Sequence, residues 1–434
     1  METATKTKGD VESTATNTVV VAVLAACFVA LIGGFLLKGQ CLAPDTFAVG
    51  KQYSHLCYND IQPLYEFRAV STDTFPYVNG SYTETGDLID GANEYPVLTG
   101  LFFWVVGLLV DNGNDFLRMT AVLMAPFALL AAYLLTRMTG RRALMWAAAP
   151  ALVYYAFHNW DLLAVAAVVA GVWFWYRGKS VWAAVMFGIG CALKMYPILF
   201  IVPLVLERWV AGRRDDAVKS FAAGAGTALA INLPFMLINF QGWWGTYKFH
   251  QLRGPNFDSI WGLLQTRYTW SLIQMPALNK TVAVLTLATF AVTIFYGWDR
   301  AKKEGVFPFL QVAGAFLVAF MLWNKVHSPQ YTLWLLPFFA LLRVNIGWWI
   351  AYTIVDTVAY VGIFRWFYDY SYLGTGLSST TAKEAMVYAV WTRAVLLVIL
   401  LVVFLRARSA VEDPDEFVSQ PGPSLDPVGD PTTA

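Results

Sequence analysis

The sequence CYNDI at residues 57–61 lies near the centre of residues 41–96, the longest polar interval between the first apolar segment and the C-terminal tail. This interval is rich in tyrosine and strongly acidic. A segment with so many aromatic residues is not typical of a disordered linker, so we predict a folded loop that packs on the rest of the chain. The charged residues of the interval are Asp45, Asp60, Glu66, Asp73, Glu84, Asp87, Asp90 and Glu94 against Lys51 and Arg68.

The composition predicts an all-α polytopic membrane protein. Of 434 residues, 58% are hydrophobic and 14% are charged, whereas about a quarter of the residues of soluble domains are charged. The mean hydropathy is +0.52, and apolar runs of about 20 residues recur along the chain. The net charge of +1 comes without a dominant basic patch, which argues against nucleic acid as a partner.

The apolar runs predict about twelve membrane-spanning helices within a membrane domain over residues 18–405. The first run has no small-residue cleavage site and is too long for the apolar h-region of a typical signal peptide, so we expect a retained anchor. Residues 1–17 and 406–434 are predicted to be disordered tails. The predicted spans are 18–37, 117–136, 143–157, 160–176, 181–195, 196–208, 219–240, 278–298, 307–324, 330–343, 345–364 and 385–405.

The basic residues of the short loops predict the orientation of these spans. Their clusters alternate so that both termini lie in the cytoplasm and the first long loop, residues 38–116, lies outside. The apolar segment 97–110 has only 14 residues, and counting it as a span would place the basic cluster 137–142 outside. We therefore predict a juxtamembrane helix there, introduced by Glu94-Tyr95-Pro96.

Several basic side chains fall near the outer ends of spans, against the usual bias of membrane proteins. An anionic ligand at that depth, such as a lipid phosphate, would explain them. The alternative is snorkelling or pairing at helix ends, for example between Asp161 and a nearby lysine. Two of these lysines lie at breaks between apolar runs, in the sequences KMYP (194–197) and NKVHSPQY (324–331). The set is Lys194, Lys248, Arg253, Lys325, His327 and Arg365.

Other chemistry finds little support in the sequence. There is no glycine-rich phosphate loop, no metal-spaced cysteine and histidine cluster, and no G-x-S-x-G motif. We therefore predict neither a metal nor a cofactor. Cys41 and Cys57 share the first outer loop and are predicted to form a disulfide in an oxidising compartment; two free thiols in a packed loop are the alternative.

A first span, an acidic outer loop, a juxtamembrane helix opened by Tyr-Pro and a following bundle resemble the GT-C superfamily of membrane glycosyltransferases. More specific sequences resemble glycosyltransferase family 87, which includes actinobacterial polyprenol-phosphate-mannose-dependent mannosyltransferases. They are EYP at 94–96, ALKMYP at 192–197, PLVLER at 203–208, KVHSPQY at 325–331 and WLLP at 334–337. The resemblance extends over most of the chain from about residue 18 to 405.

The resemblance implies a GT-C-like bundle that performs inverting sugar transfer at the outer face of the plasma membrane. The donor would be a polyprenyl-phosphate sugar, with mannose suggested by the family, and the acceptor a hydroxyl of a cell-envelope glycolipid or lipoglycan. Arabinofuranose donors carry the same lipid phosphate, so mannose rests on the resemblance alone. The residues that would hold the donor phosphate are Lys194, Lys325, His327 and Arg253.

Asp60 is the best match to the catalytic carboxylate of the family and would act as general base. Asp161 and Asp258 are the reserve candidates. A purely structural alternative is that Asp60 caps the helix that we expect to begin near Ile61.

Two other functions are compatible with the same residues. A transporter or flippase of a polyprenyl-linked lipid would use the outer cations to hold phosphate, although the folded acidic loop and the lack of detectable repeats weigh against it. The other is that of an assembly subunit of the cell-envelope machinery.

Overall fold

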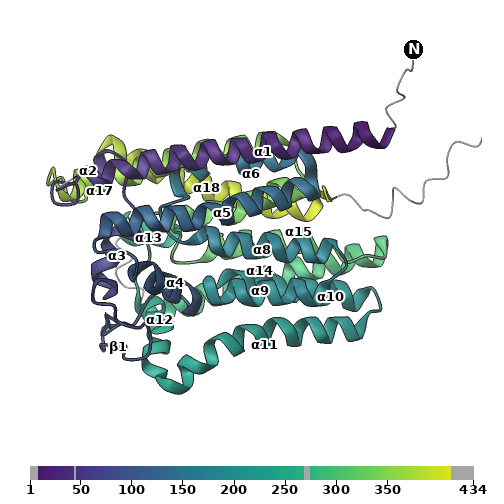
Figure 1. The fold of residues 1–434 in the computed structure, drawn as a ribbon, viewed down its shortest axis with the longest axis horizontal. Coiled ribbons are helices and arrows are strands. Elements are labelled where there is room, and N and C mark those ends of the chain that lie inside the picture. The colour runs from purple at the N-terminus through teal and green to yellow at the C-terminus, as the bar shows by residue number, and fades with distance from the viewer. Residues whose placement is uncertain (1–7, 44, 268–273, 412–434) are drawn as a thin grey trace, which may run out of the picture.

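The computed structural model describes residues 8–43, 45–267 and 274–411. Helices run side by side as a bundle, and short helices and loops gather at one of its ends (Figure 1). Within the described residues, six helices are long and apolar enough to cross a membrane. The prediction of an all-α polytopic membrane protein is thus confirmed. The long helices are α1 (Lys8–Gly39), α5 (Gly113–Thr139), α11 (Arg214–Ile238), α14 (Met275–Glu304), α17 (Ile346–Ser371) and α18 (Thr381–Arg406).

The other six predicted spans fall on shorter helices or on runs of short helices. Three are single helices: α8 (Asp161–Tyr176), α9 (Ser180–Leu193) and α15 (Phe309–Trp323). In the composite ones, Pro150, Pro197 and Pro329 lie in the first turn of a new piece, where the missing N–H of proline is tolerated. Their pieces are η3 (Gly140–Ala143), α6 (Leu144–Ala147) and α7 (Pro150–Tyr155); η4 (Tyr196–Phe200) and α10 (Ile201–Val210); and η5 (Pro329–Tyr331) and α16 (Thr332–Leu341).

The two predicted tails differ from the structure near the membrane domain. Helix α1 begins at Lys8, so the helix includes part of the predicted N-terminal tail. Strand β4 (Arg408–Ser409) pairs antiparallel with β3 (Leu342–Arg343), which gives structure to the start of the predicted C-terminal tail. The rest of both tails, residues 1–7 and 412–434, lies outside the described residues.

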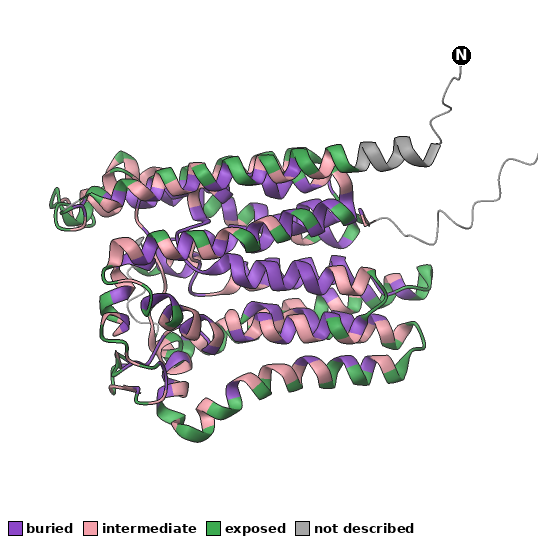
Figure 2. Cartoon of the chain, in the orientation of Figure 1, coloured by how far each residue is buried: buried purple, intermediate pink, exposed green. Residues whose placement is uncertain are grey.

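Burial follows the position of each helix in the bundle. Helix α16 is buried over its whole length, which explains why its sequence is apolar on all sides. Helix α11 lies at one edge of the bundle (Figure 2). Large apolar side chains of α11 and α14, such as Leu237 and Phe295, are each 76% exposed. In a multi-pass membrane protein, such surfaces face lipid.

The first long loop, residues 38–116, is folded and covers one end of the bundle. Because Pro96 precedes the first turn of α4, the apolar segment begins its helix at Val97 and ends it at Gly107. Both the start of α1 and the end of α18 lie at the opposite end of the bundle (Figure 1). The elements of the covered end are η1 (Gln40–Leu42), α2 (Lys51–Ser54), α3 (Ile61–Phe67), η2 (Val70–Thr72), β1 (Ser81–Tyr82), β2 (Leu88–Ile89), α4 (Val97–Gly107), α12 (Phe240–Leu252) and α13 (Ile260–Arg267).

Candidate active site

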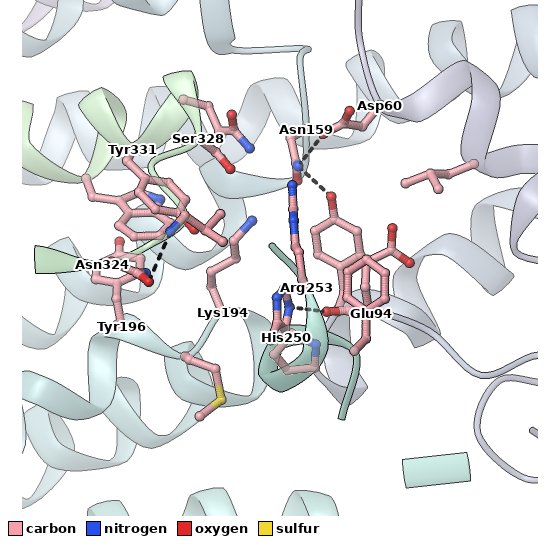
Figure 3. Close-up of a pocket in the computed structure, with 18 of the residues that line it drawn as sticks. Asp60, Glu94, Asn159, Lys194, Tyr196, His250, Arg253, Asn324, Ser328 and Tyr331 are labelled. Atoms are coloured by element: carbon pink, nitrogen blue, oxygen red, sulfur yellow. Dashed lines mark hydrogen bonds between the residues drawn. The ribbon is translucent and has the colours of Figure 1, made fainter. Parts of the chain in front are cut away.

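A cavity of about 570 Å³ lies between the folded first loop and the adjacent ends of the bundle helices (Figure 3). Its walls come from α3, from the segment before α4, from the C-terminal end of α9, from α12 and from the break between α15 and α16. Asp60 and Glu94 supply its carboxylates, and Lys194, Arg253 and Lys325 supply its strong bases.

The chain around Asp60 is fastened to the bundle from several sides. A disulfide joins Cys57 to Cys41, just beyond the end of α1. The Asp60 N–H donates a hydrogen bond of 2.8 Å to the backbone oxygen of His158, in the turn between α7 and α8. Asp60 lies about twenty residues after the first span in the sequence. These contacts nevertheless bring it back against the ends of the bundle helices.

Asn59, not Asp60, caps helix α3 through its side chain. Asn59 Oδ1 accepts a hydrogen bond of 2.9 Å from the N–H of Gln62. Asp60 occupies the N-cap position of the helix, but its carboxylate makes no capping hydrogen bond. The geometry thus argues against the capping alternative for Asp60, because the neighbouring asparagine already performs that role.

The Asp60 carboxylate is held by two neutral donors. The Tyr58 hydroxyl donates to Oδ1 at 3.0 Å, and the Asn159 side-chain amide donates to Oδ2 at 2.9 Å. Burial raises the pKa of Asp60 above its ordinary value, while the two hydrogen bonds and the charge of Lys194 oppose that rise. A positioned carboxylate with a raised pKa is suited to general-base chemistry.

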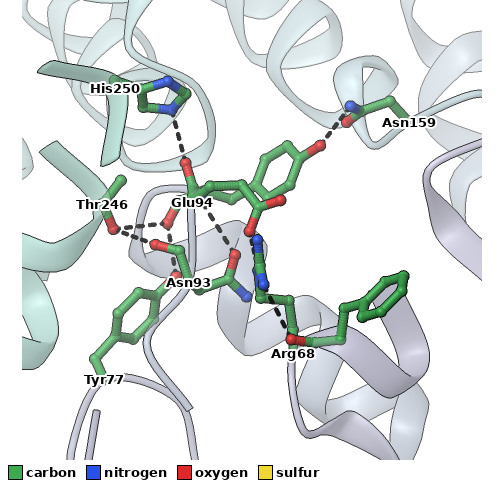
Figure 4. A network of polar contacts seen from close by, with 9 residues as sticks. Arg68, Tyr77, Asn93, Glu94, Asn159, Thr246 and His250 are labelled. Carbon is green, nitrogen blue, oxygen red and sulfur yellow. Dashed lines mark hydrogen bonds and ion pairs between the residues drawn. The ribbon is translucent and has the colours of Figure 1, made fainter. Parts of the chain in front are cut away.

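Glu94 and Tyr95 form another part of the cavity wall. A network of polar contacts holds the segment around Glu94 in place (Figure 4). The Glu94 carboxylate pairs with Arg68, and the Glu94 backbone oxygen lies 2.9 Å from His250 Nε2. Since a carbonyl oxygen can only accept, Nε2 carries the hydrogen. Desolvation and the charge of Arg253 lower the pKa of His250 below its ordinary value, which favours the neutral ring. Tyr77 donates to the Tyr95 backbone oxygen at 2.8 Å, which anchors the turn before α4.

Lys194 shares the buried carboxylate of Asp161 with a tryptophan. Lys194 Nζ lies 3.3 Å from Asp161 Oδ2, and Trp334 Nε1 donates to Oδ1 at 2.6 Å. The lysine also lies over the ring of Tyr95, 4.8 Å from its centroid. Asp161 thus lies behind Lys194 and outside the set of residues that line the cavity.

Lys325 and Arg253 are held by neutral oxygens and face the same cavity. Lys325 Nζ donates to the backbone oxygen of Gln251 at 3.0 Å, and Arg253 donates to Asn256 Oδ1 at 3.1 Å. Burial and the charge of Arg253 lower the pKa of Lys325 to about 8, which leaves it mostly protonated near pH 7. Both side chains therefore present positive charge to an anion in the cavity.

A stack of three aromatic rings forms a wall of the cavity beside Lys194. Tyr331 and Trp334 stack with centroids 3.7 Å apart, and Trp334 and Tyr196 stack at 4.1 Å. All three residues line the cavity. Such a wall offers an apolar face to a sugar ring or to the first part of a lipid chain.

Two of the predicted site residues lie at a separate small cavity. His327 and Asp258 line this second site together with Arg393, and His327 Nδ1 contacts the Met321 backbone oxygen at 3.0 Å. Burial lowers the pKa of His327 well below its ordinary value, so its ring is neutral. Burial also raises the pKa of Asp258, to about 6. The structure does not bring these two residues into the main cavity.

Several site residues were missed by the sequence analysis: Tyr58, Tyr95, Asn159 and His250. Asn159 gave the clearest signal, because a polar His-Asn pair interrupts two apolar runs at residues 158–159. The contact between Asn159 and Asp60 spans 99 residues of sequence, and no local pattern indicates it. Within the described residues, no group of three or more His, Cys, Asp or Glu side chains is placed to hold a metal ion.

The chain is similar in sequence to a curated protein and can be aligned with a solved structure. GPI mannosyltransferase 1 of Saccharomyces cerevisiae is 23% identical over 194 residues, which are 41% of this chain and 46% of the yeast protein. The chain thus spans about half the length of this curated relative. The crystal structure of ArnT from Cupriavidus metallidurans bound to undecaprenyl phosphate aligns with 89% of this chain and 76% of that chain, at 14% identity and a TM-score of 0.40. That score is below the level at which we would infer a shared fold.

The family of the chain follows from a match to a family model. The model of glycosyltransferase family 87 matches residues 94–323, a range that covers more than half of the 434 residues. It includes Glu94, Lys194 and Arg253 of the cavity, whereas Asp60 precedes it. The resemblance seen in the short motifs is confirmed: this chain belongs to glycosyltransferase family 87.

Proposed function

We propose that this protein is an inverting glycosyltransferase that transfers a sugar from a polyprenyl-phosphate donor to a hydroxyl group of a cell-envelope glycolipid or lipoglycan. The observation that carries the proposal is the composition of one cavity. Asp60 supplies a carboxylate that is oriented by two hydrogen bonds. Positive charge in the same cavity comes from Lys194, Arg253 and Lys325.

The proposed reaction is a single displacement. The acceptor hydroxyl attacks the anomeric carbon of the donor sugar while Asp60 takes the hydroxyl proton. The bond between the anomeric carbon and the phosphate oxygen breaks, and the polyprenyl phosphate leaves with the bonding electrons. The charge that develops on the leaving phosphate is stabilised by the three cations.

Attack and departure on opposite faces of the sugar invert the anomeric configuration. A β-linked donor would therefore give an α-linked product. In this scheme the lysine and arginine side chains alone balance the charge of the phosphate, so the proposal includes neither a metal nor a cofactor.

Mannose is our choice of sugar because the yeast relative is named a mannosyltransferase and because the short motifs resemble mannosyltransferases of the family. The aromatic wall of Tyr196, Trp334 and Tyr331 suits a hexose ring, which commonly packs on aromatic faces in binding sites. We assign the acceptor to the side of the cavity nearest Asp60, since the base must reach the attacking hydroxyl.

We also propose that the cavity faces outward from the plasma membrane, with both termini in the cytoplasm. The alternation of basic loops supports this orientation. A cysteine in place of the exposed Glu84 should react with an impermeant maleimide in intact cells. Labelling only after permeabilisation would contradict this orientation and place the cavity on the cytoplasmic side.

The decisive experiment uses the purified full-length protein in detergent with polyprenyl-phosphate-β-mannose and an envelope glycolipid extract. We expect release of polyprenyl phosphate and an α-mannosylated lipid, with the anomeric configuration read by NMR. The matching β-glucose and β-arabinofuranose donors serve as specificity controls. A β-linked product would contradict single displacement, and donor turnover at the same rate in Asp60→Asn would remove Asp60 as the base.

A further inference from the structure

The side chain of Lys38 is buried directly behind the Asp60 segment. This residue lies in the last turn of α1 and is 0% exposed. Its Nζ donates to the Tyr58 backbone oxygen at 2.7 Å and to the Tyr360 hydroxyl at 3.1 Å, and lies 3.3 Å from His158 Nδ1. None of the ion pairs found among the described residues includes Lys38.

Two of these Lys38 partners also hold Asp60. Tyr58 accepts from Lys38 through its backbone oxygen and donates its hydroxyl to Asp60 Oδ1. His158 contacts Lys38 through its ring and accepts the Asp60 N–H through its backbone oxygen. Lys38 is therefore connected to Asp60 through one residue on each of two routes.

A buried cation is costly unless an opposite charge compensates it. The carboxylate that the hydrogen-bond network of Lys38 reaches is that of Asp60. His158 supplies no compensating or additional charge, because burial and the charge of Lys38 lower the pKa of its ring well below the ordinary value. The ammonium of buried Lys38 and the carboxylate of partly buried Asp60 are thus linked through Tyr58 and His158, and the two charges attract each other.

We propose that Lys38 is a positioning residue that keeps the Asp60 carboxylate ionised and directed into the cavity while substrate occupies the cavity cations. This inference rests on the proposed function, in which Asp60 is the base. Lys194 also supports the charge of Asp60, but it lines the cavity, where a bound phosphate would offset its charge. Lys38 does not line the cavity, so no substrate can neutralise it.

The groups that face Asp60 determine the expected pH dependence. Burial raises the pKa of Asp60, and the charge of Glu94 adds to that rise. The hydrogen bonds from Tyr58 and Asn159, followed by the charge of Lys194, act in the opposite direction. Tyr95 is joined to the same amide of Asn159, and Arg253 lies across the cavity. The charges of Lys38 and Asp60 attract each other, so removing the charge of Lys38 should raise the pKa of Asp60.

The first test is the pH–rate profile of Lys38→Met, with Tyr360→Phe and Lys51→Met as controls. A base works only when ionised, so the rate falls as the pH drops through its pKa. We expect the acid limb of Lys38→Met to move up by about one pH unit, with about tenfold slower transfer below that limb and a rate near that of the parent at high pH. Tyr360→Phe removes a hydrogen bond of Lys38 without its charge, and Lys51→Met removes an exposed charge of the same loop, so neither should move the limb. An equal loss at every pH would show that Lys38 only supports the fold, and would overturn the proposal.

The second test needs no activity and so separates this proposal from the proposed function. It is a thermal-unfolding cycle of Lys38→Met, Asp60→Asn and the double variant. Each single change leaves one charge uncompensated, so we expect the double variant to be more stable than the sum of the two single effects predicts. Additive effects would overturn the pairing, as would a Lys38→Met protein that fails to fold and is not rescued by Asp60→Asn. Coupling in the cycle together with unchanged transfer by Asp60→Asn would leave the pair intact and reject Asp60 as the base.

Discussion

The two ends of the bundle both place basic side chains at helix termini, but the partners of those charges differ. At the end opposite the cavity, Arg142 donates to the backbone oxygen of Phe339, in the last turn of α16, at 2.9 Å. Arg300 donates to the backbone oxygens of Leu405 and Ala407, each at 3.1 Å. These carbonyls lie where helices end and lack intrahelical donors, so the arginines complete the fold.

At the cavity end, the charges are only partly satisfied by the protein. Lys325 and Arg253 each have a neutral oxygen as a side-chain partner, and Lys194 shares Asp161 with Trp334. All three of these bases line the cavity. A basic residue at a helix end therefore indicates a binding site only where its charged group faces a cavity and is not fully satisfied by groups of the protein.

The largest expected effect is on the rate of sugar transfer, and it should distinguish Asp60 from its neighbour Asn59 at the cavity end. If Asp60 is the base, Asp60→Asn should slow transfer by about 10²–10⁴-fold. The protein should remain folded, with the uncompensated charge of Lys38 as the main expected cost. Asn59→Ala should instead cost about 1–2 kcal/mol of stability through loss of the α3 cap, with transfer reduced far less. Melting temperature and single-turnover rate of both variants measure the difference, and a reversed pattern would exchange the two roles.

The second prediction concerns Lys194, which has both a structural partner and a cavity face. Lys194→Met leaves the Asp161 carboxylate buried with Trp334 as its remaining partner, and should cost about 3 kcal/mol, the low end for a broken buried pair because Lys194 reaches the cavity. Adding Asp161→Asn should restore much of the melting temperature without restoring donor use. Recovery of both would show that Lys194 only compensates Asp161 and does not bind the donor.

The third prediction compares the two ends directly. Lys325→Met should raise the donor KM by about 10- to 150-fold, with little change in melting temperature, since a charged hydrogen bond to substrate contributes about 1.5–3 kcal/mol. Arg142→Met should do the opposite, because it removes a charged donor from the Phe339 backbone oxygen at the end of α16 and costs about 1–3 kcal/mol of stability. Donor titrations and thermal unfolding of the two variants test this. An increased donor KM in Arg142→Met of similar size would contradict the division between the two ends.

The fold could be predicted from the sequence because apolar runs report burial in lipid or protein directly. All twelve predicted spans coincide with a helix or a run of short helices. Helix breaks at Pro197 and Pro329 also follow from local chemistry. The start of α1 at Lys8 could not be read this way, since polar residues extend a helix beyond an apolar run without leaving a periodic signal.

The candidate site could be predicted only in part. Lys194, Arg253 and Lys325 were expected near the outer surface, and the structure places them in one cavity with Asp60. His327 follows Lys325 by two residues yet lies at another cavity, because the segment between α15 and α16 is irregular and has no period that assigns its side chains to one face. Side-chain direction in such a segment depends on packing across the bundle.

The smallest expected effect is the pH dependence of donor binding at Lys325. Burial lowers the pKa of this side chain to about 8, so its positive charge is present below that pH and is lost as the pH rises through it. The diester phosphate of the proposed donor keeps its single negative charge over the same range. The donor KM of the parent should therefore rise by a few-fold, at most about tenfold, between pH 7 and pH 9.

Two variants of Lys325 serve as controls. Lys325→Arg keeps its charge over this pH range, because a guanidinium group is not deprotonated in proteins, so its donor KM should not change with pH. Lys325→Met should show a high KM at every pH, and the acceptor KM should not follow the same curve. A parent KM that is constant to pH 9 would mean that Lys325 does not bind the donor phosphate, and would leave that role to Lys194 and Arg253.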